Sequence, residues 1–299
     1  MLAYNGAVRI SGITIAFQAL ENGYPVVESL ASLLPLCDEV VVNCGASTDG
    51  TQEAVRGLGS AKVRLLEEPW DLSLRDKGLL LSRETNRAMD ACTGDWVIYL
   101  QADEVLHERD AAGLLTAIRE AQGHRGIDGI SFRYLHFYGS PAWVQDNPFG
   151  WYARAVRTVR RDPAIRSVGD ALKFRRTVAG RPRRVRAFRS RATVYHYGWA
   201  RPPEVMLKKQ RHLDRFWHSD AEVDRAWAGV TAAEVYRDTA HLVPFRGTHP
   251  AVMAARVVGA SWAFTPPARP AVPRWVRLAG EMMRRAAARL AGKPEDSRP

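Results

Sequence analysis

Residues 94–104 constrain the fold most strongly, because an apolar run ends there in two adjacent carboxylates. The run Trp96 to Leu100 is short, continuously apolar and preceded by a Gly-Asp turn, which is typical of a buried parallel strand. The carboxyl ends of such strands open into the crevice where α/β folds bind ligands. Asp103 and Glu104 are therefore expected at the mouth of that crevice, where hard oxygen ligands suit Mg2+ or Mn2+ carrying a diphosphate. The alternative is that both carboxylates cap the next helix or are only solvated.

The first 120 residues show alternating strand and helix patterns. Strands are predicted at residues 10–17, 39–43, 62–66 and 96–100, and helices at 24–34, after Thr51 and at 79–92. This order is typical of an α/β protein with a doubly wound, mostly parallel central sheet.

After residue 125 the pattern changes. An antiparallel strand is predicted at 129–138, further strands at 153–159 and 183–197, and a helix at 203–217. Four prolines between Pro266 and Pro273 then precede a basic, helix-compatible stretch at 275–290. We therefore expect three parts, at residues 1–125, 126–265 and 266–299. The last part is compatible with an amphipathic helix on anionic lipid, a docked terminal helix or a frayed end.

The net charge of +11 is unevenly distributed along the chain. Residues 1–120 carry 10 Lys/Arg and 18 Asp/Glu, a net of −8, so the remaining 33 Lys/Arg and 14 Asp/Glu give residues 121–299 a net of +19. Residues 151–190 alone hold 13 Arg/Lys and two acids. This basic segment favours an anionic partner, such as a lipid surface, a phosphorylated acceptor or nucleic acid, although a solvated β-ribbon would also account for it.

Several classes of protein are disfavoured. No helix-turn-helix, zinc-finger or RNA-binding signature accompanies the arginines, which argues against nucleic acid as the partner. The first apolar stretch lacks the features of a signal peptide, and no run approaches the roughly 20 apolar residues of a membrane span. Cys37, Cys44 and Cys92 have no metal-type spacing, and we expect them to be buried free thiols in a reduced cytoplasm.

A second polar motif, Asn43-Cys44-Gly45-Ala46-Ser47-Thr48-Asp49-Gly50-Thr51, lies between a predicted strand and a helix. Such turns face the same crevice as Asp103. Their side chains can cap the helix, and a helix amino terminus also favours phosphate.

Together these motifs resemble family 2 glycosyltransferases of the GT-A fold. The resemblance rests on Leu20-Glu21-Asn22, on the NCGASTDGT segment and on GDWVIYLQADE, and it covers residues 8–110. Further along, the HYGW motif at 196–199, followed by Arg201-Pro202-Pro203, is similar to a bacterial subgroup of these enzymes. The resemblance implies a nucleotide-binding α/β sandwich and glycosyl transfer from a nucleotide sugar with inversion, of the hexosyltransferase type. It also implies donor binding by residues 1–125 and acceptor binding by 126–265.

The resemblance also implies roles for individual residues. Asp103 matches the last acid of the DxD-type motif and is the expected metal ligand, whereas Gln101 replaces the first acid and leaves fewer charged ligands. His196 is a candidate second metal ligand, because neutral imidazole suits Mn2+; a buried, hydrogen-bonded histidine is the alternative. The residues expected to contact the nucleotide sugar are Asn22, Asn43, Asp49, Lys77, Gln101 and Asp103. The alternative for Asp49 is that it holds its own loop, and the alternative for Lys77 is a solvated side chain.

Inverting transfer needs a carboxylate that deprotonates the acceptor hydroxyl. Asp170 is the first candidate and Glu104 the second; an ion pair with a nearby arginine is the alternative for Asp170. Aromatic faces suit pyranose rings, so the tryptophans of the second half are candidates for acceptor binding, with core packing as the commoner role. They are Trp143, Trp151, Trp199 and Trp217.

The expected protein is thus a cytoplasmic, metal-dependent glycosyltransferase with Mn2+ or Mg2+ as cofactor. A UDP-sugar is the expected donor, a glycan or lipid-linked molecule of cell-surface polysaccharide assembly the acceptor, and peripheral contact with the inner face of the cell membrane an option. A sugar-phosphate nucleotidyltransferase is disfavoured because residues 16–23 contain no lysine or arginine. The remaining alternative is a catalytically degenerate GT-A protein that acts as a basic membrane- or polyanion-binding module, as Gln101 and Asn43 would allow.

Overall fold

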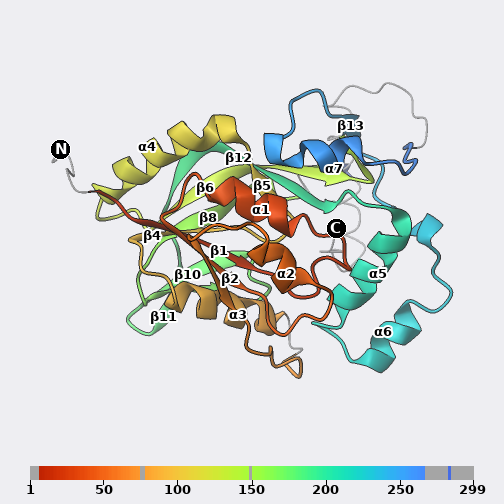
Figure 1. Cartoon of the computed structure of the whole chain (residues 1–299), viewed down its shortest axis with the longest axis horizontal. Helices are drawn as coiled ribbons and strands as arrows, with labels where there is room; N and C mark the ends of the chain where they lie inside the picture. Colours follow the sequence, from red (N-terminus) through yellow and green to blue (C-terminus); the bar gives the residue numbers. More distant parts are fainter. Residues whose placement is uncertain (1–6, 75–77, 148–149, 267–281, 284–299) are drawn as a thin grey trace.

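The computed structural model describes residues 7–74, 78–147, 150–266 and 282–283. The amino-terminal half alternates strands and helices: β1 (Ile10–Ile15), α1 (Val26–Leu33), β2 (Glu39–Asn43), α2 (Thr51–Arg56), β3 (Val63–Leu66), α3 (Leu79–Asp90) and β4 (Trp96–Tyr99). The four strands lie side by side in the order β3-β2-β1-β4, all parallel (Figure 1). The predicted α/β class, with a parallel sheet in this half, is confirmed.

The second half extends the same sheet. Strand β8 pairs antiparallel with β4, so the sheet continues across residue 125. The elements in this part are β5 (Glu104–Leu106), η1 (Glu108–Asp110), α4 (Ala111–Gln122), β6 (Gly129–Tyr138), β7 (Ser140–Gln145), β8 (Arg154–Arg160), β12 (Ala187–Trp199) and β13 (Leu242–Pro244). The division of the chain into functional parts at residue 125 stays a prediction.

A smaller antiparallel sheet and a group of short helices complete the fold. The sheet has the order β11-β10-β9 and consists of β9 (Ile165–Val168), β10 (Lys173–Val178) and β11 (Arg181–Arg184). The helices are α5 (Pro203–Asp214), α6 (Asp220–Ala226), η2 (Ala232–Glu234), η3 (Ala251–Met253) and α7 (Ala254–Val258). The single strand expected at 183–197 is wrong, because β11 ends at Arg184 and β12 begins at Ala187. Apart from residues 266 and 282–283, the expected amphipathic tail lies outside the described residues.

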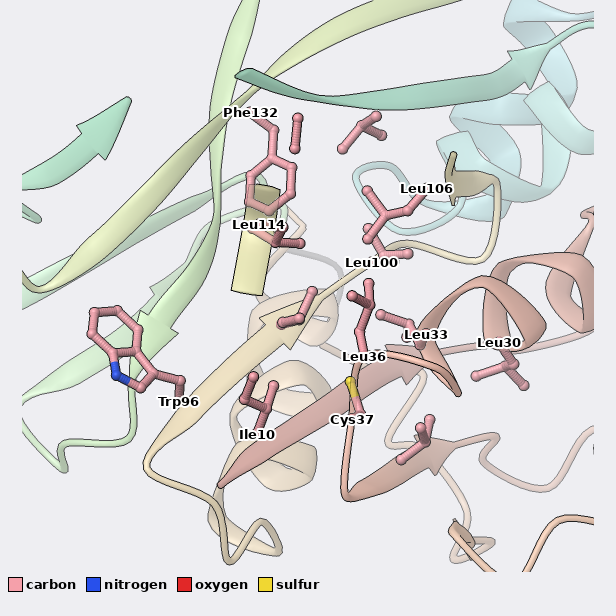
Figure 2. Packing of buried hydrophobic residues seen from close by; sticks show 14 of the residues in the cluster. Ile10, Leu30, Leu33, Leu36, Cys37, Trp96, Leu100, Leu106, Leu114 and Phe132 are labelled. Atoms are coloured by element: carbon pink, nitrogen blue, oxygen red, sulfur yellow. The ribbon is translucent and has the colours of Figure 1, made fainter. Parts of the chain in front are cut away.

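Burial on both faces of the sheet explains the uninterrupted apolar run of β4. Trp96 and Ile98 point to one face, where they join a core with residues of α1 and α4 (Figure 2). Val97 and Tyr99 point to the other, where they pack with residues of α3 and with Ile165 and Phe174 of the small sheet. All four side chains of β4 are 0% exposed, so this strand has no solvated face that would interrupt the apolar pattern.

Two further expectations concern the membrane and the cysteines. Across the part of the chain that the structure describes, no helix combines the length and the apolar character required to cross a bilayer. Cys37, Cys44 and Cys92 are buried free thiols, as predicted.

Candidate active site

A cavity of about 620 Å³ opens where the parallel strands β1 and β4 end. Helix α5 forms one of its sides and lies at the opposite end of the molecule from α4 (Figure 1). Its polar lining consists of Gln101, Asp103, Asp170, His196, Lys209, Gln210, His212 and Asp214. Its aromatic lining consists of Phe17, Tyr24, Trp70, Trp151, Tyr152, Trp199, Phe216 and Trp217. The volume is typical of a small-molecule site.

Asp103 and His196 face each other in this cavity. Asp103 lies in the turn between β4 and β5, and its Oδ2 is 3.7 Å from Nε2 of His196 on β12. The antiparallel pairing of β5 with β12 holds the two residues together, since His196 is opposite Glu104 in the register. Gly198 leaves the space between them free: a Cβ there would lie 2.4 Å from the imidazole and 2.7 Å from the carboxylate.

The carboxyl group of Asp103 is strongly biased towards ionisation. Burial disfavours its charge, but His196, Lys209 and Arg201 together outweigh burial and hold the pKa of Asp103 well below its usual value. Asp103 is therefore a carboxylate, and thus a possible cation ligand, throughout the neutral pH range.

A chain of hydrogen bonds fixes the orientation of His196. His136 Nε2 is 2.9 Å from the carbonyl oxygen of Tyr152, and His136 Nδ1 is 2.9 Å from Nδ1 of His196. Burial, reinforced by His196, lowers the pKa of His136 to about 3, so His136 is neutral. The carbonyl can only accept, so His136 donates from Nε2 and accepts from Nδ1–H of His196. With Nδ1 of His196 donating to His136, Nε2 is the ring nitrogen of His196 that faces Asp103.

These two groups fit a divalent cation. A carboxylate oxygen suits Mn2+ or Mg2+, whereas an imidazole nitrogen favours the softer Mn2+ over Mg2+. Adjacent ligands of such an ion lie about 3 Å apart, near the observed separation. Within the described residues no cluster of three or more His, Cys, Asp or Glu forms a ligand set, so the protein would supply few ligands. An ion held this way keeps positions for substrate phosphate and water.

Lys209 is a cavity residue that our reasoning from the sequence missed. It is 4% exposed, and its ammonium donates to the carbonyl oxygen of Gly198 at 2.9 Å. Burial and then Arg201 lower its pKa to about 7, which Asp103 opposes. A signal was present: Met206, Lys209 and Gln210 are the buried residues of α5, so Lys209 falls on the apolar stripe of an amphipathic helix.

Glu104, which we expected as a candidate catalytic base, lies in a buried ion pair with Arg157. It is 0% exposed, and its two carboxylate oxygens accept from Nε and Nη2 of Arg157, each at 2.8 Å. The hydroxyl of Tyr134 and the backbone amide of Gln101 also donate to it, at 2.8 and 3.1 Å. A buried cation occupies both oxygens, which favours a structural role for Glu104, and we therefore assign the proposed base to Asp170.

Asp170 lines the cavity from the turn between β9 and β10. Its side chain is exposed, and Oδ1 accepts from the backbone amide of Leu172 at 3.2 Å. Among the described residues nothing bonds to its other oxygen. Trp151, Trp199 and Trp217 line the same cavity, whereas Trp143 lies on β7 and does not.

Three expected nucleotide contacts lie outside the cavity lining. The amide of Asn43 donates to Glu84 at 2.9 Å and accepts from the indole of Trp70 at 2.9 Å, so it is used within the protein. Asp49 accepts from the backbone of Glu21 and from Thr51, and thus holds the loop. Asn22 donates to the carbonyl oxygen of Gln18 at 2.7 Å. Lys77 lies outside the described residues.

Comparisons with known proteins give one family. The sequence model of glycosyl transferase family 2 matches residues 11–175. No curated protein matches the sequence.

Solved structures show weaker likeness. Glucosyl-3-phosphoglycerate synthase from Mycobacterium tuberculosis, with Mn2+, UDP and phosphoglyceric acid, is 23% identical over 44% of this chain and 44% of that chain, with a TM-score of 0.31. S. aureus TarS with UDP-GlcNAc is 15% identical over 73% of this chain and 70% of that one, with a TM-score of 0.36. Mannosyl-3-phosphoglycerate synthase from Rubrobacter xylanophilus is 22% identical over 43% and 41%, with a TM-score of 0.31. The chain thus spans less than half the length of the two synthases.

Replacing Glu104 tests its structural role. Glu104→Gln leaves the buried guanidinium of Arg157 without a counter-charge, and we expect the free energy of unfolding to fall by about 3–5 kcal/mol. Urea unfolding followed by circular dichroism measures this change, with Glu108→Gln, an exposed neighbour in sequence, as control. A Glu104→Gln protein as stable as the wild type but inactive would return Glu104 to the role of base.

The hydrogen bonds that link His196 through His136 to the carbonyl oxygen of Tyr152 give a second prediction. His136→Phe removes the acceptor for Nδ1–H of His196, so we expect Mn2+ affinity to fall by about 10- to 100-fold. Electron paramagnetic resonance of free Mn2+ during a titration measures this affinity. His107→Phe is the matched control, since His107 is also buried but bonds to Thr248 away from the cavity. Equal Mn2+ affinities for wild type and His136→Phe would contradict this arrangement.

Proposed function

This chain belongs to glycosyl transferase family 2, and from that premise we propose that it transfers a sugar from a nucleotide-sugar donor, with a UDP-sugar expected, to an acceptor hydroxyl with inversion. The observation that supports this proposal is the cavity at the ends of the parallel strands that Asp103, His196 and Asp170 all line. A carboxylate–imidazole pair for a metal–diphosphate and a separate carboxylate for the acceptor are the two functions that such a transfer requires.

The proposed donor site is the side of the cavity formed by Asp103, His196 and α5. Asp103 and His196 would hold Mn2+ or Mg2+, which when bound would neutralise charge on the leaving diphosphate. The tryptophans of the lining offer flat apolar faces, and the rings of Trp151 and Trp199 meet edge to face with centroids 5.8 Å apart. Such a pair can position a sugar ring and exclude water from the reacting carbon.

The proposed base is Asp170. Its free carboxylate oxygen would accept the proton of the acceptor hydroxyl as the acceptor oxygen bonds to C1 of the donor sugar. The bond from C1 to the diphosphate oxygen breaks in the same step, and the nucleoside diphosphate leaves. Attack on the face opposite the diphosphate inverts the configuration at C1.

The acceptor is proposed to be presented on an anionic surface, because one face of the small sheet is strongly basic. Arg166, Arg175 and Arg184 are opposite one another across β9, β10 and β11, and Lys173 lies on the same face. Asp90 of α3 pairs with Arg166 at 2.6 Å, but among the described residues no ion pair involves Arg175 or Arg184. Like charges in opposed positions destabilise a sheet, so fold stability does not explain these two arginines. The opposite face carries Ile165 and Phe174, which are buried in the core.

The position of this basic face supports the proposal. The turn that joins β9 to β10 contributes Asp170 and Leu172 to the cavity. A surface bound to the row Arg166-Arg175-Arg184 therefore lies next to the proposed base. We propose a glycan or lipid-linked acceptor at the inner face of the cell membrane, in cell-surface polysaccharide assembly.

Nucleotide binding tests the central proposal. We expect one of UDP, GDP, dTDP and CMP to raise the melting temperature selectively, only with Mn2+ or Mg2+, and Asp103→Asn to abolish this rise because it removes the ligand charge. Asp224→Asn, at an exposed position on α6 outside the cavity lining, is the control. Asp170→Asn should keep the thermal shift and lose transfer. Binding without transfer by the wild type would favour the degenerate alternative, and no response to any nucleotide would contradict the proposal.

Vesicle binding tests the basic face. Each arginine near an anionic membrane contributes about 1 kcal/mol, so we expect Arg175→Glu/Arg184→Glu to lower binding to phosphatidylglycerol-containing vesicles at least about 10-fold. Cosedimentation measures the bound fraction, with pure phosphatidylcholine vesicles for comparison. The control is the double variant Arg119→Glu/Arg225→Glu, which changes the net charge by the same amount at positions on α4 and α6, outside the basic face. Equal loss in both double variants would show that only net charge matters and contradict a specific docking face.

A further inference from the structure

We infer that Lys209 is a built-in cation for the donor: its buried ammonium binds the diphosphate of the nucleotide sugar beside Asp103 and His196. This inference rests on the proposed function and adds a binding residue to that site. Beside the proposed metal ion, the ammonium of Lys209 would be a second source of positive charge at the diphosphate.

The first observation is the composition of the cavity wall. Among the described residues that line the cavity, Lys209 is the only lysine or arginine. The other charged groups of the lining are the carboxylates Asp103, Asp170 and Asp214. A diphosphate entering this cavity therefore meets one basic side chain among the described lining residues, Lys209 on α5.

The second observation is the incomplete hydrogen bonding of the ammonium. An ammonium has three N–H donors. Within the described residues its one hydrogen bond goes to the carbonyl oxygen of Gly198 at 2.9 Å, and its other neighbours are the rings of Tyr24 and Trp199, each with its centroid 5.6 Å from Nζ. Burying a charged donor without partners is costly, so a lysine that is 4% exposed is explained best by an anion that completes its coordination.

The third observation places this cation next to the proposed metal ligands. Gly198, which accepts from Lys209 through its carbonyl oxygen, is also the residue whose missing Cβ leaves space beside Oδ2 of Asp103 and Nε2 of His196. Lys209 is close enough to Asp103 to lower the pKa of that carboxyl group. Gly198 therefore lies beside both the ammonium of Lys209 and the Asp103–His196 pair, which places the three side chains in the same part of the cavity.

The sequence supplies a reason for such a residue. In the cavity lining 101–103, Gln101 is neutral and Asp103 is the one carboxylate that this stretch offers to a divalent ion. A lysine in the same cavity would compensate by binding phosphate oxygens directly, since lysine acts as a point charge for phosphate.

The test compares Lys209→Met with Lys208→Met. Methionine keeps the length of the side chain and its apolar stem while removing the charge, and Lys208 is the adjacent residue, exposed and paired with Glu21 at 2.8 Å. Isothermal titration with UDP, uridine and inorganic pyrophosphate is carried out for each protein, with Mn2+ or with EDTA. Lys209→Arg is included as the variant that keeps the charge.

We expect Lys209→Met to weaken UDP and pyrophosphate binding about 10- to 100-fold and to leave uridine binding unchanged, since hydrogen bonds to charged groups contribute about 1.5–3 kcal/mol. In EDTA the wild type should retain weak binding of pyrophosphate that Lys209→Met loses. Lys209→Arg should bind more tightly than Lys209→Met, and Lys208→Met should match the wild type.

Two results would overturn the inference. Unchanged UDP affinity in Lys209→Met, with binding by the wild type, would show that the ammonium does not contact the diphosphate and would leave the proposed function intact. An equal loss of uridine and UDP binding would show that Lys209 only supports the shape of the cavity. A wild type that binds neither UDP nor pyrophosphate under any condition would overturn the proposed function as well.

Discussion

The buried ion pair of Glu104 and Arg157 is the interaction on which the geometry of the candidate site depends. Both side chains are 0% exposed, and two hydrogen bonds of 2.8 Å join the guanidinium to the two carboxylate oxygens. The guanidinium also donates to the carbonyl oxygen of Leu172 at 3.2 Å. It therefore links the turn that carries Asp103 to the turn that carries Asp170. The rings of Tyr99 and Tyr134 flank the cation, with centroids 5.3 and 5.4 Å away.

The buried charge of Asp103 in the cavity is also compensated by groups of opposite charge. The ionised Asp103 lies near His196, Lys209 and Arg201, which favour its negative charge over the cost of burial. An anionic ligand and a divalent cation can enter such a site together without leaving a large net charge away from water. The aromatic side chains of the wall reduce the exposure of this polar centre to solvent, which strengthens each electrostatic contact within it.

Strands β1, β2 and β4 were predictable from the sequence because they are almost entirely buried, and β2 begins and ends where its apolar run places it. Strand β6 in the second half was predictable from its alternating pattern, which gives Gly129–Tyr138 its observed bounds. The small sheet was largely missed, since β10 and β11 are short, charged and mostly exposed, and so lack an apolar period. Asp103 and His196 belong to motifs far apart in the sequence and were expected in one site. In the structure, Oδ2 of Asp103 lies 3.7 Å from Nε2 of His196.

Residue roles were harder to predict than positions. Glu104 and Asn43 follow apolar strands as ligand-binding residues do, but each is satisfied by a partner distant in sequence, Arg157 and Trp70, which no local pattern reveals. The converse holds for Lys209, whose place in the cavity depends on how α5 packs against the end of β12.

A crystal structure of the protein with UDP and Mn2+ tests the account most directly. The account predicts the ion bound to Asp103 and His196 at about 2.0–2.3 Å, with diphosphate oxygens on the ion and on the ammonium of Lys209. A diphosphate bound elsewhere on the molecule, with Asp103 and His196 contacting neither ion nor nucleotide, would contradict it.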